Sequence, residues 1–515
     1  MTERPGHSTA EALEASVEGV PAAVSLTPSS VVPALGGELV LAPEGPEADP
    51  GAEPLVSTDS VRAGLRQAGP LAIAGLVANG AAVIVTVIMA RLLSTRGYGA
   101  LAQLTGLFLI VSMPGSAVIV GVVRHVTAWK GQGSARRIWR WARQLHLQAT
   151  VALAVFLVVV VLARGLVADA LSLPDAVGVV GVLGAGALWV LLSLDRGLLQ
   201  AHRDYRTLSL NLLVEGGART VAMLALVGLG FGVAGAAWGL FLGELVTAIH
   251  ARIVADRAWS TEARREEAAA AAARPAGEVP PRRRRASRHR TARSWWRALV
   301  RRDPVPGTAG HRRQLALDLV TALAAMALLA LLQNIDVIVL GREDPHSSGG
   351  YAAVSVASKA LVFGAIALGG YLLPEAAIRW RQGGHALRQL TVTLCLLAIP
   401  AAALLCVAVA FPHLLLSVVF SNRYLGAQHA FVWLALAMVC LSTTVVLTIY
   451  LLAIGRRWIA AILAVGAVAT TTAVAMAHGS PTSTAVSDLV VQALLALVTI
   501  AFFMGAHKQR RQLAT

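Results

Sequence analysis

Charged side chains inside long apolar runs are the residues of this sequence that could do chemistry. Glu215 and Arg219 lie four positions apart in one run and would share a helix face, while Glu244, Asp336 and Lys359 lie in three others. An ionisable group within a membrane span usually faces a bundle interior or an aqueous cavity, where it pairs, binds a charged ligand or carries a proton. These residues are the candidate binding residues, with Glu244 the candidate coupling carboxylate.

Asp336 and Lys359 have both a structural and a functional interpretation. At 1.5 Å per residue, each lies roughly 9 to 12 Å below the outer end of its predicted helix, so the two could pair on neighbouring helices. In the structural interpretation this buried ion pair fixes the helix register. In the functional one, Lys359 binds an anionic group and Asp336 is its resting partner or a protonation switch.

The other candidates leave the same choice open. Glu215 and Arg219 could pair structurally or serve a substrate or a proton, and Glu244 could be an ordinary interhelical acceptor or a coupling carboxylate. Arg91 ends the first apolar run near the predicted outer face. There it is either a cavity residue or an anchor whose charged head reaches the membrane surface.

Cofactor, metal and nucleotide sites are not predicted. Cys395, Cys406 and Cys440 lie inside apolar runs without metal-ligand spacing. None of the three lysines completes a phosphate-binding glycine-rich loop, so direct ATP hydrolysis is not expected.

Membrane helices must position these side chains. Hydrophobic residues make up 56% of the chain and charged residues 14%, and the mean hydropathy is +0.66, so lipid is the main solvent. A helix needs roughly 20 apolar residues to cross about 30 Å of hydrocarbon. We predict an all-α polytopic membrane protein with about 12 transmembrane helices, at 71–93, 101–123, 145–163, 176–194, 208–230, 233–254, 315–340, 352–373, 390–411, 431–453, 459–477 and 486–506.

Two halves of the chain repeat the same landmarks. Gly97 and Tyr98 recur 253 positions later as Gly350 and Tyr351, and Arg203 recurs as Arg456. Each landmark flanks an apolar run, and with six runs per half the two repeats have the same topology. The sequence therefore predicts two parallel six-helix bundles, 61–254 and 314–507, around a central cavity, an arrangement typical of transporters.

Basic residues concentrate in alternate loops, which sets the predicted orientation because Lys and Arg near span ends resist translocation. The basic loops contain Arg124, Lys130, Arg136, Arg137, Arg140 and Arg143, then Arg196, Arg203 and Arg206, then Arg379, Arg381 and Arg388, then Arg456 and Arg457. We predict a multi-pass protein of the cell (plasma) membrane with both termini in the cytoplasm.

Three segments lie outside the predicted bundles. Residues 1–60 are predicted to be a disordered cytoplasmic tail, 255–313 a basic cytoplasmic linker centred on Arg282–Arg285, and 508–515 a short cytoplasmic tail. The linker is expected to lie on anionic lipid headgroups, with docking of a cytoplasmic enzyme as an alternative. Nucleic acid is not expected, since few aromatics beyond Trp295 and Trp296 interleave the charges.

Polar and aromatic residues near the spans give weaker signals. Asn79, Gln103, Asn211 and Asn334 could line the cavity or form hydrogen bonds between helices. Tyr98, Tyr351, Tyr205 and Trp458 are predicted to be aromatic anchors at the membrane surface.

Short motifs in both halves resemble one family of membrane proteins. Ala90–Gly99, which reads ARLLSTRGYG, is similar to the first helix-loop-helix junction of bacterial polysaccharide-unit flippases. Gln333–Arg342 (QNIDVIVLGR) and Val419–Tyr424 (VFSNRY) resemble that family's second bundle. The chain thus resembles oligosaccharide-lipid flippases of the multidrug/oligosaccharidyl-lipid/polysaccharide (MOP) exporter superfamily. This superfamily includes multidrug and toxic compound extrusion (MATE) antiporters and the lipid II flippase.

The resemblance implies two bundles that rock about a central cavity. It also implies a polyprenyl-diphosphate-linked oligosaccharide as substrate, moved to the outer leaflet for cell-surface polysaccharide biosynthesis, and polysaccharide-assembly proteins as partners. Because an unpaired diphosphate cannot cross hydrocarbon at an acceptable cost, the protein must supply cationic or polar groups such as Arg219 and Lys359.

Two other functions fit the same span count. A cation-coupled multidrug or metabolite antiporter would favour an acidic, aromatic-rich interior, whereas aromatic residues are only 5% of this chain. A membrane polysaccharide polymerase would need catalytic groups in extended outer loops. The predicted outer loop Arg342–Gly350 contains Glu343, Asp344 and His346 but no second cluster, so we do not expect an enzyme.

Overall fold

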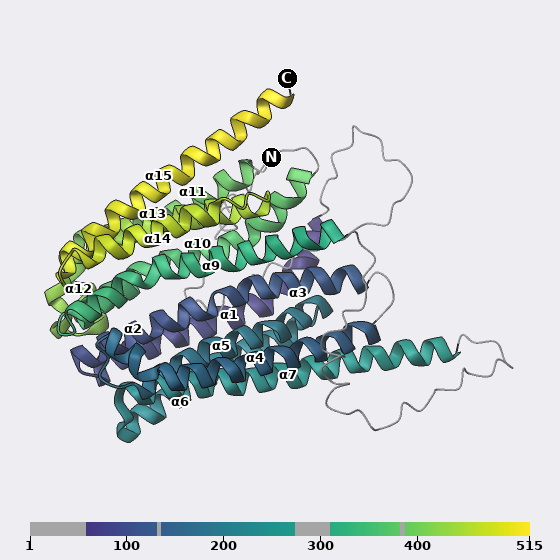
Figure 1. Ribbon diagram of the computed structural model, residues 1–515, viewed down its shortest axis with the longest axis horizontal. Helices are drawn as coiled ribbons and strands as arrows, with labels where there is room; N and C mark the ends of the chain where they lie inside the picture. Colours follow the sequence, from purple (N-terminus) through teal and green to yellow (C-terminus); the bar gives the residue numbers. More distant parts are fainter. Residues whose placement is uncertain (1–57, 131–134, 273–308, 382–386, 515) are drawn as a thin grey trace, which may run out of the picture.

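The apolar runs form long helices that lie side by side in two groups (Figure 1). The computed structural model describes residues 58–130, 135–272, 309–381 and 387–514. Residues 1–57 of the predicted tail 1–60 and the basic run Arg282–Arg285 lie outside these ranges, whereas residues 58–60 form the start of a helix. Within the described residues the secondary structure is helical throughout, without strands, as the sequence predicts.

The first half of the chain forms the purple-to-teal group in Figure 1. Its helices are α1 (Thr58–Leu92), α2 (Thr95–Ser112), α3 (Pro114–Lys130), α4 (Ala135–Ala170), α5 (Val177–His202), α6 (Tyr205–Leu226), the short η2 (Val227–Phe231) and α7 (Gly232–Ala272). The second half forms the green-to-yellow group. It consists of α9 (Ala309–Glu343), α10 (Ser348–Arg381), α11 (Leu387–Ala410), α12 (Pro412–Leu415), η3 (Leu416–Phe420), η4 (Asn422–Ala427), α13 (Ala430–Ala453), α14 (Ile459–Ala475) and α15 (Pro481–Ala514).

The predicted spans coincide with these helices. Ten helical segments of the described chain are long and apolar enough to cross a membrane, one of which runs through α6 and α7 together. Counting α6 and α7 separately and adding α14, an apolar helix of 17 residues, gives the twelve crossings expected from the sequence. The second crossing is shared by α2 and α3, which meet at Met113 and Pro114.

A hairpin of α6 and α7 shows how small residues bring charged helices together. The chain turns at η2, where Gly230 and Gly232 adopt φ values of 93° and 53° that disfavour other residues. Gly239 and Gly243 then lie one turn apart on α7, and a Cβ at Gly243 would be only 2.6 Å from the Cα of Arg219 on α6. Such close backbone contact is typical of small residues repeated every four positions in membrane helices. It places Arg219 beside the α7 carboxylate Glu244.

Helix α7 continues well beyond residue 254, where the sequence predicts the linker to begin. Ala255, Trp259 and Ala263 are buried in a cluster with residues of α3, α4 and α5, and Trp259 Nε1 donates to the carbonyl of Leu198 at 3.2 Å. At the start of α4, the backbone N–H of Ala135 donates to Glu266 at 2.8 Å. Residues 255–272 are thus a rigid extension of the first half, because their apolar face has partners to bury against.

The two halves meet along α2, α3, α9 and α10. Helix α2 packs on both α9 and α10, and α3 packs on α9. The approach of α2 to α9 is close, since a Cβ at Gly341 would lie 2.1 Å from Nε2 of Gln103. A side chain at position 341 would therefore force the Gln103 side chain to move.

Candidate functional site

The predicted pair of Asp336 and Lys359 is present in the second half. Lys359 Nζ on α10 lies 3.2 Å from Asp336 Oδ1 on α9. The hydroxyl of Tyr351 donates to the other carboxylate oxygen of Asp336 at 3.1 Å, and all three side chains are buried. Asp336 is therefore satisfied by one cation and one phenol.

A second buried carboxylate, Asp488 on α15, lies near this ion pair. The candidate site residues predicted from the sequence do not include it. It is 0% exposed, accepts a hydrogen bond from Gln492 Nε2 at 3.1 Å, and interacts electrostatically with Asp336 and Lys359. Gln492 also donates to the carbonyl of Leu332 on α9 at 3.4 Å. The signal was visible in the sequence as a carboxylate interrupting the last apolar run. The group formed by Asp336, Tyr351, Lys359 and Asp488 is called the α9–α10–α15 cluster below.

The first half contains its own buried charge network, on α5, α6 and α7. Arg219 on α6 bonds Glu215 one turn earlier at 2.5 Å and also bonds Glu244 on α7. Arg196 on α5 bonds the other oxygen of Glu215 at 2.5 Å. The shared helix face predicted for Glu215 and Arg219 is confirmed. Arg196, Glu215, Arg219 and Glu244 are called the α5–α6–α7 network below.

Arg196 overturns one sequence expectation. It was assigned to a basic cytoplasmic loop, but it lies inside α5 with a fully buried side chain. Besides Glu215, its Nε donates to Oδ1 of Asn211 at 2.8 Å, and Asn211 in turn donates to the carbonyl of Thr247 at 3.1 Å. Asn211 thus acts as a bridge between α5, α6 and α7. The helix continues past the apolar run because partners on α6 compensate the charge of Arg196.

The two clusters differ in charge balance. The α5–α6–α7 network has two arginines and two carboxylates, so its ionised groups cancel. The α9–α10–α15 cluster has two carboxylates and one lysine. In both clusters the cations are held by protein carboxylates. An anionic ligand could therefore bind a cation only by displacing these carboxylates or after they are protonated.

Arg91 lies elsewhere, at the end of the molecule that the sequence predicts to face outside. Its side chain is exposed and donates to the carbonyl of Val418 on η3 at 2.7 Å. In the opposite direction, Arg423 on η4 donates to the carbonyl of Arg91 at 2.8 Å, and the hydroxyl of Tyr424 donates to that of Ala90. Two arginines therefore cap backbone carbonyls across the halves. We call this contact the outer seam, and a substrate-binding role for Arg91 stays a prediction.

The repeated landmarks lie beside this seam, where the first turns of α2 and α10 meet. A Cβ at Gly99 would lie 1.9 Å from Oγ of Ser348, and one at Gly349 would lie 2.1 Å from the carbonyl oxygen of Thr95. Tyr98 and Tyr351 are buried here rather than at the membrane surface, so their predicted role as anchors is wrong. The ring of Tyr98 instead packs on Tyr424, with centroids 5.5 Å apart.

The outer seam joins the two halves at one end of the molecule, and the ionisable groups lie within each half. The outer seam consists of side chains that bond backbone carbonyls, and the glycine contacts between α2 and α10 lie beside it, so both can separate without breaking a helix. The buried clusters supply groups that can exchange a proton or an ionic partner.

Comparisons with known proteins identify the fold. No protein-family model matches the sequence, and no curated protein matches it. Among solved structures, the chain is similar to an inward-facing MATE family multidrug resistance transporter of the MOP superfamily, with a TM-score of 0.62 and 10% identity over 84% of this chain and 96% of that one. It is also similar to the lipid II flippase MurJ in an inward closed conformation, with a TM-score of 0.58 and 10% identity over 84% and 87%.

A third similar structure is a MOP superfamily transporter from Pyrococcus furiosus, with a TM-score of 0.51 and 14% identity over 84% of this chain and 92% of that one. All three neighbours are transporters or flippases. The chain therefore shares its helical fold with these MATE, MurJ and MOP superfamily structures.

Proposed function

We propose that this protein flips a polyprenyl-diphosphate-linked oligosaccharide from the cytoplasmic to the outer leaflet of the plasma membrane by alternating access. The product would supply cell-surface polysaccharide biosynthesis. Both termini would lie in the cytoplasm, and the lipid tail would stay in the bilayer while the protein shields the charged head.

The observation that carries the proposal is a cation in each half that is held by buried carboxylates, in a molecule whose outer seam is closed. Arg219 and Lys359 are the cations, and Glu215, Glu244 and Asp336 hold them. A diphosphate provides the same kind of oxygen ligands as these carboxylates, so it can replace them around the cations, provided that the displaced carboxylates take up protons. The sequence resemblance to polysaccharide-unit flippases supports this substrate class.

The proposal gives the carboxylates a specific task. Protonation of Asp336 would release Lys359 for the diphosphate. Protonation of Glu244 would remove one of the two carboxylates that hold Arg219, so Arg219 could bind the diphosphate while Glu215 stays paired with Arg196. Opening of the outer seam would then expose the headgroup to the outside. There Asp336 and Glu244 would release their protons to the outside solution, re-form their ion pairs with Lys359 and Arg219, and so displace the diphosphate. In this scheme Glu244 is the coupling carboxylate of the first half.

The proposal is tested by loss of function in the membrane. Cells depleted of the protein are expected to accumulate lipid-linked glycan that an impermeant sugar-modifying reagent cannot reach from outside. Accumulation on the outer leaflet instead would place the block at polymerisation or ligation and contradict the proposal.

A cation-coupled antiporter is the second candidate, and one observation favours it. The α9–α10–α15 cluster has two carboxylates, Asp336 and Asp488, for a single lysine, which suits a cationic ligand better than an anionic one. Proteoliposomes distinguish the candidates: an antiporter moves a cationic dye against an imposed proton or sodium gradient, and Asp488→Asn abolishes that movement. A flippase transfers lipid-linked glycan between leaflets without moving the dye.

A further inference from the structure

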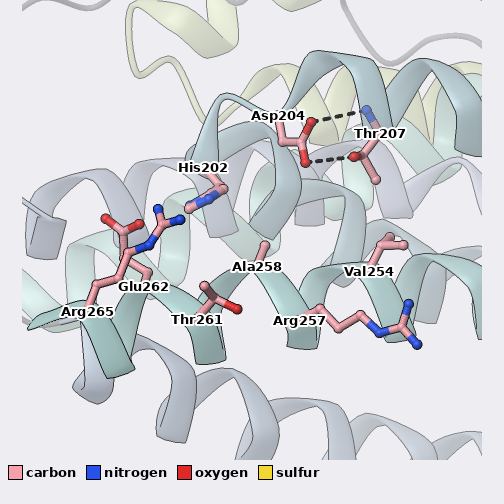
Figure 2. A pocket seen from close by; sticks show the side chains of 9 residues that line it. All are labelled: His202, Asp204, Thr207, Val254, Arg257, Ala258, Thr261, Glu262 and Arg265. Carbon is pink, nitrogen blue, oxygen red and sulfur yellow. Dashed lines mark hydrogen bonds between the residues drawn. The ribbon is translucent and has the colours of Figure 1, made fainter. Parts of the chain in front are cut away.

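A pocket of about 380 Å³ lies where the first half leaves the membrane on its predicted cytoplasmic side (Figure 2). One wall is the turn between α5 and α6, with His202, Asp204 and Thr207, and the other is the extension of α7. Volumes from about 300 Å³ upward are typical of sites for small ligands. Because α5 ends at His202 and the sequence predicts that the sixth span ends at Val254, we expect this pocket to lie near the level of the lipid headgroups.

The α7 wall presents a row of donors. Arg257, Thr261 and Arg265 follow one another at four-residue spacing, so they lie along one stripe of the helix. Figure 2 shows Arg265 at the end near His202 and Arg257 at the opposite end of the row. The two guanidinium groups flank the Thr261 hydroxyl along this stripe and point to opposite ends of the row (Figure 2), so their flexible side chains would have to turn inward to reach the same phosphate.

Two nearby arginines, Arg252 and Arg136, have carboxylate partners, whereas Arg257 and Arg265 have none among the residues that the structure describes. Arg252 pairs with Asp195 and Asp256, and Arg136 on α4 pairs with Glu267. Within the described part of the chain, the side chains of Arg257 and Arg265 form no ion pair or hydrogen bond. They are exposed on the pocket side of a helix whose opposite face is rigidly packed through Trp259.

The carboxylates of the pocket leave room for an anion. Asp204 is occupied as the cap of α6, since its two oxygens accept from the backbone N–H of Thr207 at 3.1 Å and from its hydroxyl at 2.7 Å. Glu262 is the other carboxylate in the lining. It can meet the amine or hydroxyl of a headgroup whose phosphate is held by the arginines.

From these observations we infer that the pocket binds the phosphate of a phospholipid headgroup from the cytoplasmic leaflet, through Arg257, Arg265 and Thr261. The membrane is the expected source of the phosphate because we expect the pocket near headgroup level, on a helix that continues past its predicted span. A bound lipid there would join the α5–α6 turn to the α7 extension. This inference does not depend on which substrate the protein transports.

The test measures lipid binding by the purified full-length protein in detergent. Phosphatidylglycerol is titrated against the wild type and the double variant Arg257→Gln/Arg265→Gln, and bound lipid is counted by native mass spectrometry. The double variant is expected to bind the tightest lipid about tenfold more weakly, since each arginine at a membrane surface contributes to headgroup attraction. The matched control, Arg206→Gln/Arg264→Gln, removes the same charge from exposed positions outside the pocket and is expected to bind like the wild type.

Two further measurements distinguish a local loss of lipid binding from a folding defect, and a lipid site from a site for free phosphate. Restoration of binding by Arg257→Lys/Arg265→Lys, with unchanged thermal unfolding of all variants without lipid, would show that the loss is local and not a folding defect. Equal lipid affinity for the wild type and the double glutamine variant would overturn the inference. If inorganic phosphate displaces phosphatidylglycerol at similar concentrations, the pocket is a site for free phosphate, and its assignment to a membrane lipid is wrong.

Discussion

Lys359 on α10 and Asp336 on α9 form a buried ion pair of 3.2 Å between neighbouring helices of the second half. Taking either charge away leaves the other without its ionic partner in a medium that solvates it poorly. Breaking a buried pair in this way typically costs about 3 to 5 kcal/mol. The pair is therefore both a structural element and, in the proposed mechanism, a switch.

A charge swap separates these two roles. Asp336→Lys/Lys359→Asp is expected to restore the insertion and thermal stability that Lys359→Met loses, but not transport of lipid-linked glycan, because the cation then lies on α9 rather than α10. Thermal unfolding in detergent and the leaflet assay are measured on the same variants. Full recovery of transport by the swap would assign the pair a purely structural role.

Because Arg219 bonds two carboxylates of the α5–α6–α7 network, we expect its replacement to lower the free energy of unfolding substantially. Arg219→Met leaves Glu215 with Arg196 alone and removes the cation beside Glu244, and we expect a loss of about 3 kcal/mol in the free energy of unfolding. Adding Glu244→Gln is expected to recover part of it. Arg206→Met, at an exposed position of the same helix, should stay within about 0.5 kcal/mol of the wild type. Chemical denaturation in detergent measures all three, and equal effects at 219 and 206 would contradict the network.

The close contact of Gly99 with Ser348, beside the outer seam, predicts that a larger side chain at position 99 separates α2 from α10. A side chain there meets Ser348 at once, so Gly99→Leu is expected to push the first turns of α2 and α10 apart. Hydrogen exchange of residues 95–101 and 348–354 should then become faster. The control Gly217→Leu, on α6 with open space around its Cβ, should leave exchange at both turns unchanged. Unaltered exchange in Gly99→Leu would mean that the seam is not a contact that opens.

Asp344, in the turn before α10, predicts a pH dependence outside the membrane. Partial burial acts to raise its pKa, but hydrogen bonds from the Ser347 hydroxyl and from the N–H groups of His346 and Ser347 outweigh this and lower the pKa below its ordinary value. Because the folded pKa is depressed, the stabilisation is present above the unfolded pKa of about 3.9 and is lost as pH falls through the folded value.

Asp344→Asn is accordingly expected to lower the free energy of unfolding by about 1 kcal/mol at neutral pH, since it weakens the hydrogen bonds that the carboxylate accepts in this turn, and by less below about pH 4. Thermal unfolding across that pH range checks this. The neighbouring exposed variant Glu343→Gln should show little change at any pH. A constant difference between Asp344→Asn and the wild type at all pH values would contradict this account.

The helices of this protein are predictable because span length depends only on local apolar content. The interior of the membrane forces each run of about 20 apolar residues to form helix, since backbone polar groups have no other partners there. The pairing of Asp336 with Lys359 was predictable for a related reason, because each is an isolated charge at similar depth in a neighbouring span.

Other features depend on tertiary partners that no local pattern reveals. Arg196 was expected in a loop because it follows an apolar run, and only Glu215 and Asn211 on α6 explain its burial. Helix α7 extends past residue 254 because Trp259 packs against α5. Asp488 was visible in the sequence, but its relation to the α9–α10 pair arises only when α15 packs against that region.

The most direct test of the proposed function is the leaflet distribution of polyprenyl-linked glycans in membranes lacking the protein, measured with an impermeant sugar-modifying reagent. The proposal predicts that these lipids accumulate on the cytoplasmic leaflet, protected from the reagent, and become accessible again when the wild-type chain is restored. Unchanged pools with an unchanged leaflet distribution would contradict it and favour the antiporter.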